Sequence, residues 1–304
     1  MATASTTSLE DAEAAYALFE ESPVKAVRAA RRSLERSRRE RCPEAEVVAL
    51  HALAVALFEV GDPRAIQSAR AAVRVADREG LVLRGARARR VLAAIYAHRG
   101  SPRAALRELD AAMPAFDERE RARSEVARLA VLMVIGGEAV SLDAALAAAR
   151  TLGRAGDTVW EARLRGNLGL ALVEHGRLAE AETELLRARS LYARNGADAG
   201  VRSADLARAW LCLLKGDLGA CLRLVDELSG EDAPPREAAE ALFIETQASV
   251  AAGLLDEARR AIVRLRALNR SRGVVEPWQQ LELSRLALLS GDAALARQEA
   301  VRVR

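Results

Sequence analysis

Residues 165–188 read RGNLGLALVEHGRLAEAETELLRA, and their pattern predicts two amphipathic helices joined by a tight turn. In the first helix, Leu168, Gly169 and Leu172 share one face, because residues three and four positions apart lie on the same side of an α-helix. Gly176 follows at the point where the chain needs a left-handed residue to leave the helix. This stretch therefore predicts a helix that ends at a glycine turn.

The second helix of the same stretch carries Ala181, Leu185 and Ala188, which recur at intervals of four and three. A small residue in each helix, Gly169 in the first and Ala181 in the second, lets the two helix axes approach closely. We therefore expect the two helices to pack against each other as an antiparallel pair.

The same layout recurs eight times at intervals of 37 to 40 residues. The turns fall at Ser22, Gly61, Gly100, Gly137, Gly176, Gly216, Gly253 and Gly291. Seven positions before each turn stands a residue that is not bulky, namely Ala15, Ala54, Ala93, Ala130, Gly169, Ala209, Thr246 and Ser284. A fixed internal layout at a constant period is typical of a stacked array of structural repeats.

The predicted fold is all-α, with sixteen helices in eight antiparallel pairs. The expected first helices span residues 9–20, 44–59, 82–98, 119–135, 157–174, 200–214, 235–251 and 276–289. The expected second helices span residues 23–40, 62–79, 102–117, 140–154, 178–195, 217–229, 254–272 and 292–303. We expect one domain over residues 1–304, with residues 1–8 as a disordered tail.

The order of residues in each unit resembles the tetratricopeptide repeat (TPR) family. That pattern asks for Leu, then Gly or Ala, then a large residue, a Gly, and after it Ala, a large residue and Ala. The matching residues of the clearest unit are Leu168, Gly169, Leu172, Gly176, Ala181, Leu185 and Ala188. Later units depart from the pattern, with Arg208 and Glu245 at the Leu position, and the period exceeds the family's 34 residues. The resemblance implies a right-handed superhelical solenoid.

The stretch 157–164, DTVWEARL, is similar to the N-terminal repeat arrays of actinobacterial CHAT proteins, which are caspase-like proteases fused to TPRs. The catalytic domain of those proteins has no counterpart in this sequence, so no catalytic residue carries over. The resemblance implies a sensor or docking part of a larger effector system. The alternative is the effector-binding repeat domain of a LuxR-like transcription regulator.

Composition agrees with a folded helical protein and limits its partners. Hydrophobic residues make up 51% of the chain and aromatic residues only 3%, so the apolar share is mainly Ala, Leu and Val. The net charge is only +3, from 46 basic and 43 acidic residues, and predicts no nucleic-acid partner. No apolar run has the length of a membrane span, and the N-terminus does not resemble a signal peptide. With three cysteines in no metal-binding spacing, we expect a cytoplasmic protein.

The sequence predicts no enzymatic site. The three histidines, His51, His98 and His175, fall in different repeats, and no phosphate-binding or dinucleotide-binding glycine motif is present. We therefore expect no catalytic residue, no cofactor and no metal site. The predicted function is a scaffold for protein–protein interaction.

In TPR arrays the first helices line a concave groove that holds a peptide or protein segment. The corresponding positions here are Tyr16, Phe19, His51, Val55, Phe58, Arg87, Arg90, Arg163, Leu170, Val173, Trp210, Leu213, Phe243 and Trp278. Apolar residues with arginines among them favour an amphipathic helix or an acidic–apolar peptide as the ligand. The alternative is tight curvature, in which these residues simply contact the next pair.

The last residues, 301–304, fall inside an expected second helix, whereas repeat arrays usually close with a polar capping helix. We therefore expect that the natural chain continues, or that a partner associates through this end.

Overall fold

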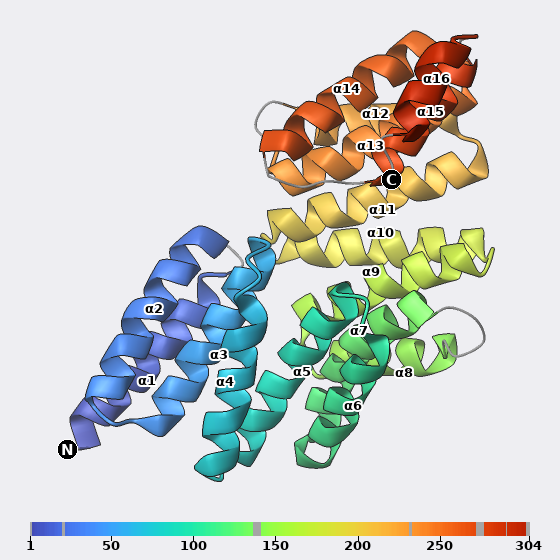
Figure 1. The fold of residues 1–304 in the computed structure, drawn as a ribbon. Helices are drawn as coiled ribbons and strands as arrows, with labels where there is room; N and C mark the ends of the chain where they lie inside the picture. Colours follow the sequence, from blue (N-terminus) through green and yellow to red (C-terminus); the bar gives the residue numbers. More distant parts are fainter. Residues whose placement is uncertain are drawn as a thin grey trace. The chain divides into compact units, whose positions relative to one another are not determined.

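The computed structural model describes residues 2–19, 22–135, 141–230, 233–271, 277–289 and 291–301. Within these ranges all regular structure is helical, and sixteen α-helices follow one another along the chain (Figure 1). The first helices of the pairs are α1 (Ala2–Ala17), α3 (Pro43–Glu59), α5 (Val82–His98), α7 (Glu118–Ile135), α9 (Thr158–Glu174), α11 (Asp198–Lys215), α13 (Pro235–Ala251) and α15 (Pro277–Leu289). The second helices are α2 (Pro23–Arg39), α4 (Ala65–Arg78), α6 (Pro102–Ala112), α8 (Leu142–Arg154), α10 (Leu178–Arg194), α12 (Leu218–Leu228), α14 (Leu255–Ser271) and α16 (Ala293–Val301).

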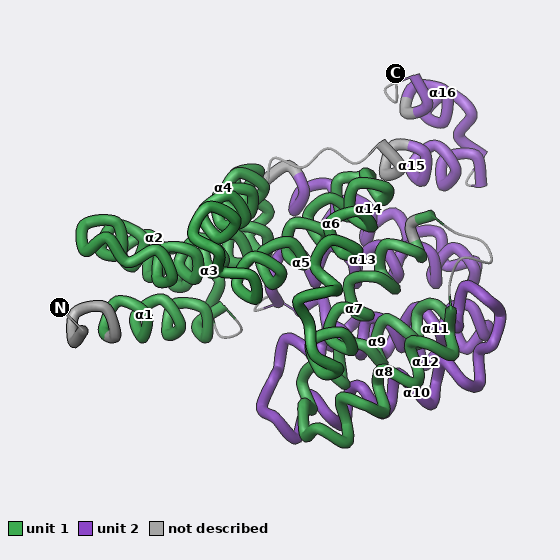
Figure 2. The backbone as a smooth tube through the Cα atoms, turned by 90° about the horizontal axis from the view of Figure 1, so that it is seen from below, with its two compact units in different colours: residues 1–171 green, residues 172–304 purple. Residues whose placement is uncertain are grey.

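The all-α class and the sequential antiparallel pairing are confirmed. Winding of these pairs into a right-handed solenoid stays a prediction. So does the expectation of one domain, because the chain divides into two compact units, residues 1–171 and 172–304 (Figure 2). The boundary falls inside α9, and the units are described separately.

In unit 1, each helix packs against the next one along the chain from α1 to α8. The first helices also contact one another in sequence, α1 with α3, α3 with α5 and α5 with α7. The largest core cluster buries Leu50, Leu53 and Leu57 of α3 together with Leu92 and Ile95 of α5. The first helices therefore supply most of the large apolar side chains, and the second helices cover them with small ones.

Unit 2 repeats this arrangement from α10 to α16, and its first helices α11 and α13 are also in contact. One cluster centres on Leu206, Val225 and Ile244, and a second on Ile262 and Leu265. As in unit 1, each cluster joins one helix pair to the next.

Left-handed glycines end most of the helices. Of the predicted turn residues, Gly61, Gly100, Gly176, Gly216, Gly253 and Gly291 have φ between 68° and 80°. Gly137 lies outside the described residues. A second set, which the sequence analysis did not identify, ends second helices at Gly80, Gly156 and Gly196 with φ between 63° and 68°. Only glycine adopts this conformation without strain between Cβ and the backbone.

The small residues seven positions before the turns lie where helices cross. Ala54, Ala93 and Ala209 are fully buried. Ser284 of α15 donates its hydroxyl hydrogen to the carbonyl oxygen of Ala296 in α16, with an Oγ–O distance of 2.8 Å. A side-chain oxygen this close to its neighbour's backbone requires closely approaching helices, so the predicted role of the small residue is supported at this pair.

Helices α1, α4 and α6 depart most from their predicted bounds. Helix α1 begins at Ala2, before the predicted start at residue 9, and Ser8 is buried and hydrogen-bonded to the Glu40 carboxylate. The disorder expected for residues 1–8 stays a prediction. Helix α6 ends early, at Ala112, because Pro114 lacks a backbone donor, and a short 3₁₀ helix (Met113–Ala115) follows. Helix α4 begins at Ala65, three residues after the predicted start.

Candidate functional site

Several predicted ligand-facing residues lie together in unit 1. The Tyr16 ring of α1 lies 5.0 Å from the His51 ring of α3 and 5.2 Å from the Phe19 ring, measured between centroids. The guanidinium of Arg163, from α9, lies 5.5 Å from the centroid of Phe19. Residues more than 140 positions apart in the sequence therefore share one surface of this unit.

Trp160 of α9 extends this surface. Its ring has three guanidinium groups around it, those of Arg90, Arg163 and Arg123, at 4.9, 5.1 and 5.5 Å from the ring centroid. Arg90 also lies 5.4 Å from the centroid of Phe116. Each such cation–π contact contributes about 0.5–2 kcal/mol, with the larger values at sites shielded from water.

We call this continuous set the ring–guanidinium row. Its members are Tyr16, Phe19, His51, Arg90, Phe116, Arg123, Trp160 and Arg163. The first helices α1, α3, α5, α7 and α9 or the residues that flank them supply all eight side chains. The row therefore exists only when these five first helices are packed in unit 1.

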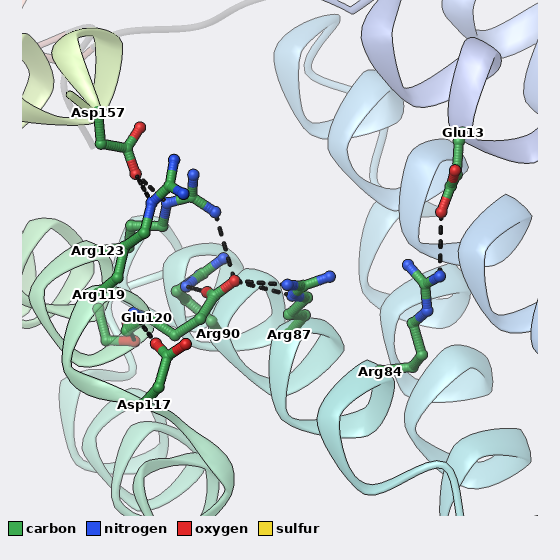
Figure 3. Close-up of polar contacts among 10 residues, drawn as sticks. Glu13, Arg84, Arg87, Arg90, Asp117, Arg119, Glu120, Arg123 and Asp157 are labelled. Atoms are coloured by element: carbon green, nitrogen blue, oxygen red, sulfur yellow. Dashed lines mark hydrogen bonds and ion pairs between the residues drawn. The ribbon is translucent and has the colours of Figure 1, made fainter. Parts of the chain in front are cut away.

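Glu120 of α7 holds three guanidinium groups at the back of the row (Figure 3). Arg90 Nη1 lies 2.6 Å from Oε2, while Arg87 Nη2 and Arg123 Nη1 lie 2.7 and 3.3 Å from Oε1. Burial alone raises the pKa of this carboxyl, but Arg90, Arg87 and Arg123 outweigh burial, and the pKa is lowered. Glu120 is therefore charged at neutral pH.

Asp157, just before α9, fixes the same region from the other side. Its Oδ2 accepts hydrogen bonds from Nε of Arg119 at 2.8 Å and from Nε of Arg123 at 2.6 Å (Figure 3). Burial raises the pKa of Asp157, but these two hydrogen bonds and the arginine charges outweigh it and lower the pKa. Arg123 thus joins Asp157 to Glu120.

A separate ion pair joins the start of the unit to α5. Nη2 of Arg84 lies 3.0 Å from a carboxylate oxygen of Glu13 in α1 (Figure 3). The same atom lies 3.1 Å from a carboxylate oxygen of Glu44 in α3. Both acids are about half exposed, so this bridge contributes less to stability than the pairs of Glu120.

Partial exposure separates the residues that a ligand can reach from those that support them. Tyr16, Phe19, Trp160 and Arg163 are partly exposed. Arg90 is only 7% exposed, so it supports the rings of the row and is not itself accessible to a ligand. Ring faces beside guanidinium groups bind apolar and anionic groups, and the row carries no arrangement of nucleophile and base.

The other predicted residues fall outside the row. Arg87 pairs with Glu120, Phe58 packs edge-on against His98 at 5.4 Å, and Val55 and Leu170 are partly buried. In unit 2, Trp210 stacks on Phe243 at 6.1 Å, and Leu213 packs against the adjoining core. Val173 is buried, and the side chain of Trp278 lies outside the described residues.

Glu120, Arg123 and Trp160 were missed by the sequence analysis. The predicted positions were counted back from each turn over about thirteen residues, and Trp160 stands sixteen residues before Gly176. A count extended over the whole first helix finds Trp160. The ion pairs of Glu120 with Arg87 and Arg90 had no signal in the sequence, because they join different repeats.

Two shallow depressions lie elsewhere. One, of about 540 Å³, is lined by residues of α8 and by Glu161, and one of about 550 Å³ lies at the turn between α13 and α14. Among the described residues, no three His, Cys, Asp or Glu side chains are grouped to hold a metal ion. In the same ranges, no helix combines the length and apolarity that crossing a bilayer requires.

Comparison with known proteins gives no family assignment: no family model matches the chain, and no curated protein matches its sequence significantly.

Proposed function

We propose that this protein is a non-catalytic scaffold that binds a peptide or protein segment along the first helices, with the ring–guanidinium row as the main contact in unit 1. The observation that carries the proposal is the convergence of Tyr16, Phe19, Trp160 and Arg163 from helices far apart in the sequence. Partly exposed aromatic and arginine side chains are the types that dominate binding energy at protein interfaces.

The chemistry of the row favours a segment with both apolar and acidic side chains. Apolar groups pack on the rings of Phe19 and Trp160, while a carboxylate pairs with Arg163 or with Arg119, which is 49% exposed. The supporting ion pairs at Glu120 and Asp157 hold the guanidinium groups in place before a ligand arrives, which lowers the entropic cost of binding.

On the resemblance of residues 157–164, we assign this scaffold to the sensor or docking part of a larger effector system. Within such a system the repeats capture a partner, and another domain carries out the chemistry. The resemblance to TPR arrays, whose first helices hold peptides, supports the same assignment.

The test is selection of peptides from a displayed random library on the full chain, followed by affinity measurements on the enriched peptides. Arg163→Gln and Trp160→Leu are expected to weaken binding at least about tenfold, because each removes an interface anchor. The matched control is Arg150→Gln, an exposed arginine on the second helix α8. Thermal unfolding of all three variants establishes that they fold.

Two results would contradict the proposal. In the first, no peptide is enriched. In the second, the enriched peptides bind the folded Arg163→Gln and Trp160→Leu variants as tightly as the unchanged chain.

A further inference from the structure

Helix α2 concentrates positive charge far beyond the average of the chain. Its sequence, PVKAVRAARRSLERSRR, holds seven basic residues and a single acidic one, Glu35. This one helix therefore carries a net charge of +6, whereas the whole chain carries only +3. The even overall balance conceals this local excess.

The buried face of α2 is made of small residues, which directs the basic side chains outward. Ala26, Ala30, Ser33 and Ser37 are buried against α1 and α3. Packing of this face holds the basic residues on the outer side of α2, because they lie on the opposite face of the same helix.

Two of the seven basic residues are neutralised by neighbours. Arg36 pairs with Asp11 of α1 at 2.6 Å and with Glu40 at 2.8 Å, and Arg38 pairs with Glu46 of α3 at 2.8 Å. These pairs lie along the two edges where α2 meets the adjoining helices.

The other five are exposed and form no ion pair with any described residue; we call them the α2 stripe. They are Lys25, Arg28, Arg31, Arg32 and Arg39. Acidic residues near the stripe are Asp62, which senses the charge of Arg31, and Glu40, which senses that of Arg39. Glu35 of α2 itself stands three or four positions from Arg31, Arg32 and Arg39. Lys25, Arg28, Arg32 and Arg39 are spaced by three, four and seven residues, so they share one face over about 21 Å at 1.5 Å per residue.

We propose that the α2 stripe is a second docking surface, which binds an acidic segment of a partner protein. An acidic helix with Asp or Glu at the same spacing places its carboxylates opposite these cations, and the arginine forks bind carboxylates in two-point geometry. This surface is separate from the ring–guanidinium row, because it belongs to a second helix, whereas first helices or their flanking residues supply the row.

The surroundings of the stripe favour an acidic protein segment over the other anionic partners. Helix α1, packed beside α2, exposes Glu10 together with Asp11 and Glu13, which are paired with Arg36 and Arg84. This acidic side of α1 offers no further cations to a nucleic-acid duplex, whose major groove alone is about 12 Å wide. A single helix, about 10–12 Å across, can follow the stripe without meeting these acids. Insertion into a membrane surface requires an apolar face, and that of α2 is buried.

The experiment measures binding of a fluorescent helical peptide with Glu at repeating i, i+3, i+4 and i+7 positions, by anisotropy with the full chain. The same peptide with Gln in place of Glu is the negative probe. We expect saturable binding of the Glu peptide that weakens as salt is raised above about 0.15 M, and no binding of the Gln peptide. The test variant is Arg28→Gln/Arg32→Gln/Arg39→Gln, for which we expect at least tenfold weaker binding.

The control variant is Arg107→Gln/Arg150→Gln/Arg223→Gln, which removes the same net charge from exposed sites outside α2. It is expected to bind the peptide like the unchanged chain. Equal weakening of both variants would overturn the proposal, because it would show a general charge effect. Binding of a DNA or RNA duplex, or of phosphatidylserine vesicles, through the α2 stripe without binding of the Glu peptide would also overturn it. We expect variants of Trp160 and Arg163 to leave this binding unchanged, so the two proposals can fail separately.

Discussion

The carboxylate of Glu120 is 5% exposed and lies against guanidinium groups from α5 and α7. Removing two opposite charges from water costs several kcal/mol, and the attraction between them repays this cost only when geometry and hydrogen bonding are good. With three arginines on one carboxylate, the network fixes the positions of the side chains more than it adds to the free energy of unfolding. Its consequence at the surface is that Arg90 and Arg123 are held beside the Trp160 ring.

The imidazole of His51 leads to a prediction about the pH dependence of stability. Burial, together with Arg90, Arg87 and Arg84, lowers the pKa of His51 to about 3. In the unfolded chain this group takes up a proton below about pH 6.5, while the folded chain keeps it neutral. The unfolded state therefore binds more protons between pH 6.5 and 3, and stability falls as the pH is lowered through this window.

Between pH 7 and pH 5 we expect this residue to account for a loss of about 1–2 kcal/mol in the free energy of unfolding. Urea unfolding at the two pH values measures the loss, and His51→Gln is expected to remove it. His175→Gln, at an exposed position, serves as the control and should leave the loss in place. An unchanged pH dependence in His51→Gln would show that the imidazole is not kept neutral by its surroundings.

At the scale of helices, local signals sufficed for most of the fold. A glycine that must adopt positive φ, as at Gly61 or Gly216, and apolar residues spaced by three and four depend only on nearby sequence, so helix existence and pairing could be predicted. The early end of helix α6 was not predicted, because the effect of Pro114 on the helix was overlooked.

The candidate site was predicted less fully than the fold. Counting back from the turns identified Tyr16, Phe19 and Arg163, because a repeat places equivalent residues on equivalent faces. It could not identify Glu120, since which acid meets which arginine depends on how successive pairs pack. The contact of Arg163 with Phe19 depends on the packing of the helices of unit 1 from α1 to α9 and has no local sequence signal.

Substitution by Ala is expected to have opposite effects on stability at two glycines, Gly166 within α9 and Gly176 in the turn after it. A Cβ at Gly166, in the middle of the helix, meets no atom within 4 Å, so Gly166→Ala is expected to stabilise the protein by about 0.5–1 kcal/mol. Gly176, in the turn after the helix, has φ of 71°, so Gly176→Ala is expected to destabilise it by about 1–2 kcal/mol. Thermal unfolding of the two variants measures both effects. If both shifts had the same sign, the backbone role assigned to Gly176 or the open space at Gly166 would be wrong.

For the whole molecule, the pattern of contacts makes stability local. Described helices pack mainly on the next helix in sequence or on the next first helix. In such arrays, stability is close to a sum of repeat and neighbour terms, so one part can open while another remains folded. The ring–guanidinium row departs from this pattern, because it joins α9 to α1 within unit 1. We therefore expect a substitution that disrupts the row to destabilise the helices of unit 1 together.

Glu120→Gln tests this expectation by hydrogen–deuterium exchange with mass spectrometry. The variant leaves Arg90 buried without its carboxylate, which we expect to destabilise unit 1 by about 3 kcal/mol. Amide exchange should accelerate in α1, α3, α5 and α7 and remain unchanged in α13 and α14 of unit 2. Glu180→Gln, which removes an exposed partner of Arg177 on α10, should leave exchange in unit 1 unaltered. Equal acceleration in both units upon Glu120→Gln would mean that the chain unfolds as one cooperative body. Acceleration confined to α5 and α7 would mean that the row does not join α1 to the rest of unit 1.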